Sequence, residues 1–245
     1  MRLNPGKKTT TEAPQKLSRL ERMQETLKEV RKRAKSSFYK LTSGRTVIRI
    51  LPPIEEDGDW YFRSYLHYRI GPDSYAVCCP NLMLKKKCPI CEKITELAEG
   101  DETERKIAKA LDPKLRVYAN AFIKDSGVKV LPFGKTVFEA LLSHFTDPEW
   151  GDLDDIETGH NITIVKSGEK FETAYEVRPA PKARPLEEFI GDNELEDVLK
   201  ARKDLSKVVT IFSYDELEEL LDATDLPALL KRTPRKDKKS EDSDD

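Results

Sequence analysis

The chain has 245 residues, of which 38% are hydrophobic and 36% are charged, so it can bury a core beneath a heavily charged surface. Its 43 basic and 45 acidic side chains leave a net charge of −2, which excludes a uniformly basic or acidic protein. No apolar run has the length of a membrane span and the N-terminal segment lacks the apolar region of a signal peptide. We therefore expect no membrane partner and a cytoplasmic location, where thiols stay reduced.

Residues 1–37 are predicted to form an N-terminal basic arm followed by a helix. The first 16 residues are polar and contain prolines, whereas Leu20, Met23, Leu27 and Val30 recur at helical spacing. The helix ends in the basic segment 31–35, and cations suit a helix C-terminus. The same charges also suit an arm that contacts phosphates or a neighbouring protein, and the sequence favours neither interpretation.

The segment from residue 38 to residue 230 is predicted to be the folded core. Short β-branched and aromatic runs between Gly and Pro signals predict strands at residues 45–51, 60–70, 74–77, 115–123, 128–133, 161–165 and 171–177. Helical patterns follow Glu92, Asp101, Gly134 and Ser213. Strands interrupted by helices indicate a mainly β protein with helical insertions (α+β). We predict an OB-fold core, a five-stranded Greek-key barrel, with a zinc-binding subdomain at about residues 61–112. Residues 231–245 are predicted to be a disordered tail that ends in acidic residues.

All four cysteines lie close together in the sequence, and a histidine precedes them. Cys88 and Cys91 form a Cys-x-x-Cys turn, with Cys79 and His67 upstream. Three thiolates and one imidazole complete the tetrahedral shell of a structural zinc site, so we predict one bound Zn²⁺. Cys79 is favoured over Cys78 because Cys79-Pro80 repeats the Cys88-Pro89 pattern, but the sequence leaves that choice open.

Several enzymatic interpretations of these motifs are weaker. A thiol–disulfide site would require a βαβ context and would not use the upstream cysteine. A zinc deaminase needs a glutamate two residues after the histidine, where this chain has Arg69. The Gly-Lys-Thr sequence at 134–136 lacks the glycine of a phosphate loop, because that position is Lys129. His144 and His160 have no evident nucleophile partner, so we expect a protein that is not an enzyme.

Aromatic residues alternate with basic residues along the predicted strands. Single-stranded nucleic acid requires this combination, because bases stack on aromatic rings and cations contact phosphates. Phe62 and Phe122 are expected in the core instead. The basic run 85–87 beside the zinc turn is a candidate phosphate contact. The predicted nucleic-acid-binding residues are Arg49, Tyr61, Arg63, Tyr65, Tyr68, Arg69, Tyr75, Lys86, Lys87, Arg116, Tyr118, Lys124, Lys129 and Phe133.

The order of these segments resembles the single-stranded DNA-binding (helix-destabilising) proteins of T-even-type bacteriophages. The similarity covers roughly residues 38–225. The matching segments are Val47–Pro52, His67 with Cys79 and Cys88–Cys91, Tyr118–Asn120, Ile123–Asp125 and Val128–Phe138. The resemblance implies an OB-fold, a zinc held by His67, Cys79, Cys88 and Cys91, and location in a phage-infected host cell.

The resemblance also implies partners. The family self-associates along DNA through a basic N-terminal arm, for which Lys7-Lys8-Thr9-Thr10 or residues 31–37 are candidates here, and its acidic C-terminal tail recruits replication and recombination proteins. The sequence therefore predicts a protein that coats and protects single-stranded DNA, without sequence preference, during replication, recombination and repair. The main alternative is a zinc-containing adaptor that binds replication or transcription proteins and has little DNA affinity, and a thiol oxidoreductase is the third possibility.

Overall fold

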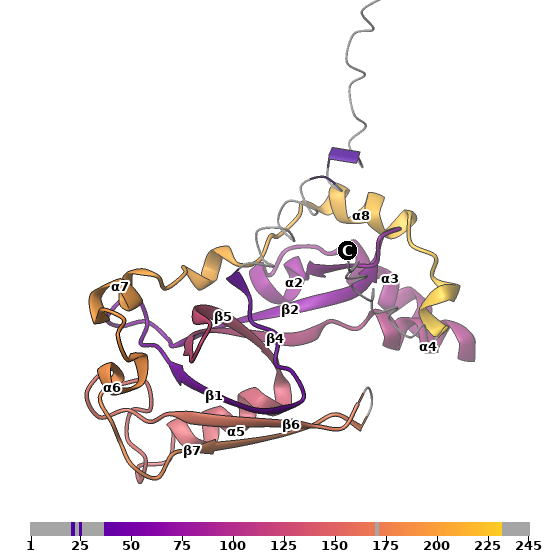
Figure 1. Ribbon diagram of the computed structural model, residues 1–245. Helices are drawn as coiled ribbons and strands as arrows, with labels where there is room; N and C mark the ends of the chain where they lie inside the picture. Colours follow the sequence, from indigo (N-terminus) through magenta and orange to yellow (C-terminus); the bar gives the residue numbers. More distant parts are fainter. Residues whose placement is uncertain (1–20, 23–24, 26–36, 170–171, 232–245) are drawn as a thin grey trace, which may run out of the picture.

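The computed structural model describes residues 21–22, 25, 37–169 and 172–231 (Figure 1). Almost all of the predicted arm, and all of the predicted tail except Lys231, lie outside these residues. The predictions for those two segments are therefore untested.

Seven strands in the described residues form one antiparallel sheet. The strand order is β3-β2-β4-β1-β6-β7, and β5 pairs with β4. The strands are β1 (Gly44–Ile50), β2 (Tyr61–Ile70), β3 (Tyr75–Cys78), β4 (Lys114–Ile123), β5 (Gly127–Gly134), β6 (Ile162–Ser167) and β7 (Ala174–Pro179). The predicted mainly β class with helices is confirmed.

Strand β4 holds the sheet together because it pairs with three other strands. Its first part pairs with β2 and its last residues pair with β1, while β5 follows it from Arg116 to Ile123. The turn of the β4–β5 hairpin contains Asp125-Ser126-Gly127. Asp125 and Gly127 have φ angles of 70° and 71°, and glycine adopts this left-handed conformation without steric cost. The predicted strands at residues 115–123 and 128–133 are therefore confirmed.

The sheet curls around helix α5 (Lys135–Phe145). In a flat sheet, β5 and β7 would lie about 19 Å apart, four strand spacings, whereas a helix is only about 10–12 Å across. Helix α5 nevertheless contacts both strands. Its residues Val137, Phe138 and Leu141 share one apolar cluster with Phe133 of β5 and Val177 of β7. This cluster is called the sheet core below. No ladder in the described residues joins β5 to β7, so the curled sheet stays open at that seam.

A second core lies beside the cysteines, and we call it the metal-side core. The segment between β3 and β4 contains three helices, α2 (Pro80–Leu84), α3 (Pro89–Ala98) and α4 (Glu102–Leu111), and α3 and α4 contribute buried residues to this core. Asp101 and Glu104 form a capping box at the start of α4, where the sequence predicts a helix. The core also contains residues far along the chain, from Phe212 through α8 (Tyr214–Asp222) to Leu229 in η3 (Pro227–Leu230). The insertion at about residues 61–112 therefore needs a C-terminal segment to complete its core.

A third, smaller cluster covers part of the opposite face of β4. Phe122 packs there with buried residues of α6 (Leu186–Ile190) and α7 (Leu195–Lys200). The chain after α7 is fixed by two sets of hydrogen bonds. Asn120 bonds both the backbone N–H and the carbonyl of Lys203, and Arg202 donates to the Pro52 and Pro53 carbonyls at 2.8 and 2.6 Å. The short 3₁₀ helix η2 (Leu205–Lys207) follows. No helix among the described residues has the length and apolar character needed to cross a membrane.

Candidate metal centre and nucleic-acid interface

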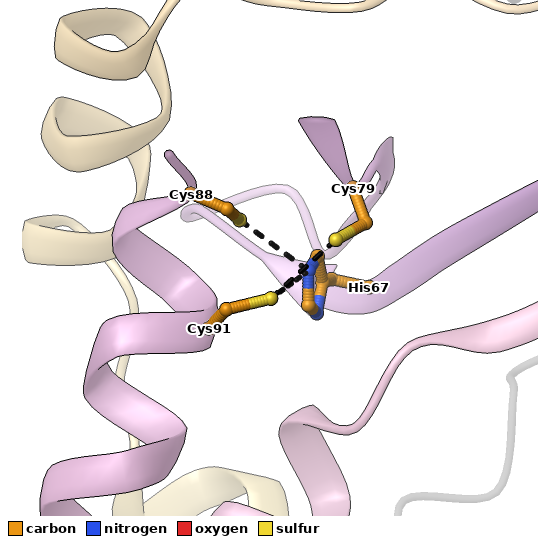
Figure 2. Close-up of side chains that lie close together, drawn as sticks. All are labelled: His67, Cys79, Cys88 and Cys91. Atoms are coloured by element: carbon orange, nitrogen blue, oxygen red, sulfur yellow. Dashed lines mark hydrogen bonds between the residues drawn. The ribbon is translucent and has the colours of Figure 1, made fainter. Parts of the chain in front are cut away.

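Four potential ligands converge from three places in the chain (Figure 2). His67 lies on β2, Cys79 follows β3, and Cys88 and Cys91 lie at the start of α3. Cys79 and Cys88 are positioned by the same local structure. Cys79 and Cys88 are N-cap residues with extended backbone, each is followed by proline at the first helical position, and neither side chain caps its helix. Both thiols are therefore available to the cluster.

The spacing of the four ligand atoms fits a tetrahedral zinc ion. All four atoms lie within 4.8 Å of one another. The Cys79 and Cys91 sulfurs are 3.4 Å apart, and His67 Nε2 lies 3.6 Å from Cys88 Sγ and 3.8 Å from Cys91 Sγ. Tetrahedral bonds of typical zinc lengths place two sulfurs about 3.8 Å apart and nitrogen about 3.5 Å from sulfur. The cluster could thus hold a metal ion, and its donor set is compatible with zinc.

Hydrogen bonds prepare His67 and Cys79 for this role. His67 Nδ1 lies 2.7 Å from the Leu111 carbonyl, which turns Nε2 toward the sulfurs. Burial lowers the pKa of His67, but hydrogen bonds with Cys79, Cys88 and the Leu111 carbonyl together raise it to about 9. The contacts with Cys88 and Cys91 lower the pKa of Cys79. Zinc binds thiolates and a neutral imidazole, so the lowered pKa of Cys79 favours metal binding, whereas a proton on His67 Nε2 would have to leave when the metal binds.

The structure places Cys79, and not Cys78, in the cluster. Cys78 ends β3 opposite Leu66, and adjacent residues of an extended chain point to opposite sides. Its side chain is buried, and burial raises the pKa of the Cys78 thiol to about 12. Cys78 is therefore a packing residue of the described fold, as Cys79-Pro80 had suggested.

Several predicted DNA contacts are interior residues, and the structure contradicts a direct contact for each. Arg49 is fully buried, and its guanidinium donates to the Asp155 and Arg184 carbonyls at 2.7 and 3.0 Å. Burial lowers the pKa of Arg49, while Asp155 and Asp154 oppose this shift. Tyr75 lies in the metal-side core and Phe133 in the sheet core, so neither ring is available for stacking.

The remaining predicted residues, apart from the buried Tyr118, keep at least part of their surface. Arg69 is partly exposed and donates to the Leu229 carbonyl at 2.5 Å, which ties β2 to η3. Tyr61 packs edge-on against Phe138, with the Arg63 guanidinium 5.9 Å from its ring centre. Among these predicted residues, the exposed ones are Arg63, Lys86, Lys87 and Lys124, and the partly exposed ones are Tyr61, Tyr65, Tyr68, Arg69, Arg116 and Lys129.

The strand register collects aromatic and basic residues on one face of β2 and β4. Phe62 lies opposite Tyr118, and Ser64 lies opposite Arg116. Phe38 stacks on Tyr118 at 5.8 Å, and burial raises the pKa of Tyr118 to about 12. We call Phe38, Phe62, Ser64, Arg116 and Tyr118 the aromatic face. Tyr118 itself is only 6% exposed, so its ring supports Phe38 instead of offering its own surface to a ligand.

Sequence reasoning misjudged Phe62 and did not single out Phe38. Phe62 was expected in the core together with Phe122, yet Phe62 is partly exposed whereas Phe122 is buried. The alternation of residues along β2 separates Phe62 from Tyr61, and this signal was available in the sequence. The other two histidines contact backbone carbonyls. His144 Nε2 lies 3.3 Å from the Val177 carbonyl oxygen, and His160 Nδ1 lies 2.7 Å from the Ala180 carbonyl oxygen.

The chain matches a known protein family over most of its length. The family described as gp32 DNA binding protein like matches residues 42–225, which is well over half of the chain. A search of curated proteins finds no match. The matched range includes all seven strands, the metal-ligand cluster and most of the C-terminal segment that packs against it. The chain therefore belongs to the gp32-like family of DNA-binding proteins.

Proposed function

We propose that this protein binds single-stranded DNA without sequence preference and coats it during replication, recombination and repair in a phage-infected cell. The observation that carries the proposal is the aromatic face, where a partly exposed Phe62 lies across the ladder from Tyr118, and Arg116 lies two residues from Tyr118 on the same face of β4. Bases of any sequence can stack on such rings while the guanidinium contacts phosphate. Membership of a DNA-binding family supports the same conclusion. We further infer that the curled sheet is a barrel of the OB type, a fold whose surface binds oligonucleotides.

In this proposal the metal has a structural role. His67, Cys79, Cys88 and Cys91 would hold one zinc ion that joins β2 to the N-terminus of α3. Zinc with four protein ligands has no open position for a substrate, so its contribution is folding energy. The N-terminal arm and C-terminal tail would support self-association along DNA and recruitment of replication proteins, as in the resemblance described above. Both segments lie almost wholly outside the described residues.

Titration with an oligothymidine strand at two salt concentrations tests the proposal. Binding should weaken steeply with salt, with a slope of about −0.7 for each phosphate contacted, and the same sample should contain about one zinc per chain. Phe62→Ala should weaken binding roughly 5- to 150-fold, since base stacking on an aromatic ring contributes about 1–3 kcal/mol.

The matched control for this variant is Phe189→Ala. Phe189 is also partly exposed, but it lies on α6 and packs edge-on against Phe122. We expect this control to lower stability without a comparable loss of affinity. Equal losses for the two variants would show that the aromatic face does not contact DNA.

An adaptor protein is the second candidate function, because an apolar surface lies beside the metal cluster. Leu82 and Leu84 on α2 are 39% and 48% exposed, and they precede the basic run Lys85–Lys87. Such a surface suits contact with another protein. Zinc without any salt-sensitive oligothymidine binding would support this candidate and contradict the first.

A further inference from the structure

A pocket of about 150 Å³ lies at the open seam of the curled sheet, and we call it the seam pocket. Residues from both sides of the seam line it, Phe133 from β5 and Lys166 from β6. Leu41, Phe133 and Val137 are buried and form its apolar floor. One ordered water needs only about 10–15 Å³ of such space, so the seam pocket has room for a larger group.

Three cations line this pocket: Lys40, Arg116 and Lys166. Lys166 pairs with Tyr175 across the β6–β7 ladder and donates from Nζ to the Leu41 carbonyl at 3.2 Å. Arg116 donates from Nη2 to the Pro132 carbonyl at 3.3 Å. Neutral carbonyls thus hold two of the three cations in place without cancelling their charge. No carboxylate occurs among the described residues that line the pocket, so its field favours an anion.

The backbone at the pocket adds to this preference. Gly134 lines the pocket and is the N-cap of α5, an 11-residue helix with no acidic residue in its first turn. A Cβ added to Gly134 would meet no atom within 4 Å, so open space lies above this backbone. The free N–H groups at a helix start favour anions, and here they reinforce the three cations.

We propose that the seam pocket binds a phosphate group, and that in the intact complex this is one backbone phosphate of the bound single strand. The second part rests on the proposed function. Arg116 belongs to both the aromatic face and the seam pocket, so a strand whose bases stack on that face passes beside the pocket. A phosphate monoanion between Lys40, Arg116 and Lys166 gains charge-assisted hydrogen bonds, and the apolar floor leaves it few competing waters.

The pocket can be tested without DNA. Inorganic phosphate is titrated into ¹⁵N-labelled protein against sodium chloride at equal ionic strength, and amide shifts are followed by NMR. The amides of Gly134 and Lys135 should shift and saturate with phosphate, and Lys40→Gln should reduce the response. Shifts spread over many exposed lysines, or no response at Gly134, would overturn the pocket.

The second arm asks whether DNA supplies the phosphate. Lys40→Gln and Lys166→Gln should each weaken oligothymidine binding, and the loss of one phosphate contact should reduce the salt slope by about 0.7. Lys200→Gln is the matched control, because Lys200 lies on α7 and pairs with Glu196. Lys40 is exposed and lies outside the strands, so we expect Lys40→Gln to leave the stability unchanged. If Lys166→Gln lowers stability, the DNA affinity of Lys40→Gln decides whether the pocket contacts a DNA phosphate.

The two arms separate the pocket from the proposed function. Normal DNA affinity and salt slope in both variants would overturn the DNA assignment, even if inorganic phosphate binds. If the wild-type protein binds no oligothymidine, the proposed function fails, and the response of Gly134 to inorganic phosphate alone decides whether the pocket exists. Displacement of bound phosphate by oligothymidine in the wild type would support both parts.

Discussion

Replacing Cys88 by serine should unfold the metal-side core while the sheet core stays folded. Cys88 is 1% exposed, and its sulfur lies 3.6 Å from His67 Nε2. Structural zinc contributes about 10–16 kcal/mol to the folding of small zinc modules, whereas a whole domain has a net stability of only about 5–15 kcal/mol. Loss of a thiolate ligand therefore removes more free energy than this small core can replace. Residues of α3 should lose amide protection in hydrogen exchange, and β1 and β6 should keep theirs.

The matched control is Cys78→Ala, which removes an equally buried thiol outside the ligand cluster. This variant should keep about one zinc per chain and retain protection in α3. The interpretation fails if Cys88→Ser keeps wild-type protection in α3 after treatment with a chelator. It also fails if Cys78→Ala loses the metal as completely as Cys88→Ser does.

Two further predictions concern the buried guanidinium and its surroundings. Arg49→Lys should lower the free energy of unfolding by about 1–3 kcal/mol, because a lysine cannot reach all the acceptors that Arg49 bonds. A thermal melt measures this loss. A fall in DNA affinity without a fall in melting temperature would contradict the structural role. Gly159→Ala should cost about 1–3 kcal/mol, since an added Cβ would meet the Leu153 carbonyl at 2.6 Å and the Arg49 guanidinium at 2.7 Å. Gly134→Ala, whose Cβ enters open space, should cost less in the same denaturation experiment, and equal losses would contradict this account.

The metal-ligand cluster was predictable because its signal is chemical and local. His67, Cys79, Cys88 and Cys91 lie within one short stretch, and few other roles combine three thiols with an imidazole. The capping boxes at Asp101 and Ser213 were predictable for the same reason, since each depends on residues three positions apart. Local patterns of this kind need no knowledge of which elements pack together.

The separation of buried from exposed aromatic and basic residues was not predictable from local patterns. Alternation along a strand assigns residues to two faces, but it does not say which element covers each face. Arg49 is buried because the loop at Asp155 and the segment at Arg184, both more than a hundred residues away, close over it. Tyr75 is buried because α8 completes the metal-side core from the far end of the chain.

Strand β2 connects the metal-ligand cluster to the aromatic face, because it contributes residues to both. Its first residue, Tyr61, packs against the sheet core, and the next residue, Phe62, lies on the aromatic face. Its last residue, Ile70, lies in the metal-side core. His67 is on the same strand, and its ring is held by the Leu111 carbonyl on one side and the cysteine sulfurs on the other. A metal ion that fixes His67 therefore fixes the C-terminal half of β2, and the ladder to β4 carries that order to Phe62. Metal removal should then weaken DNA binding even though no ligand touches the aromatic face. Phe62→Ala should weaken it with the metal still bound.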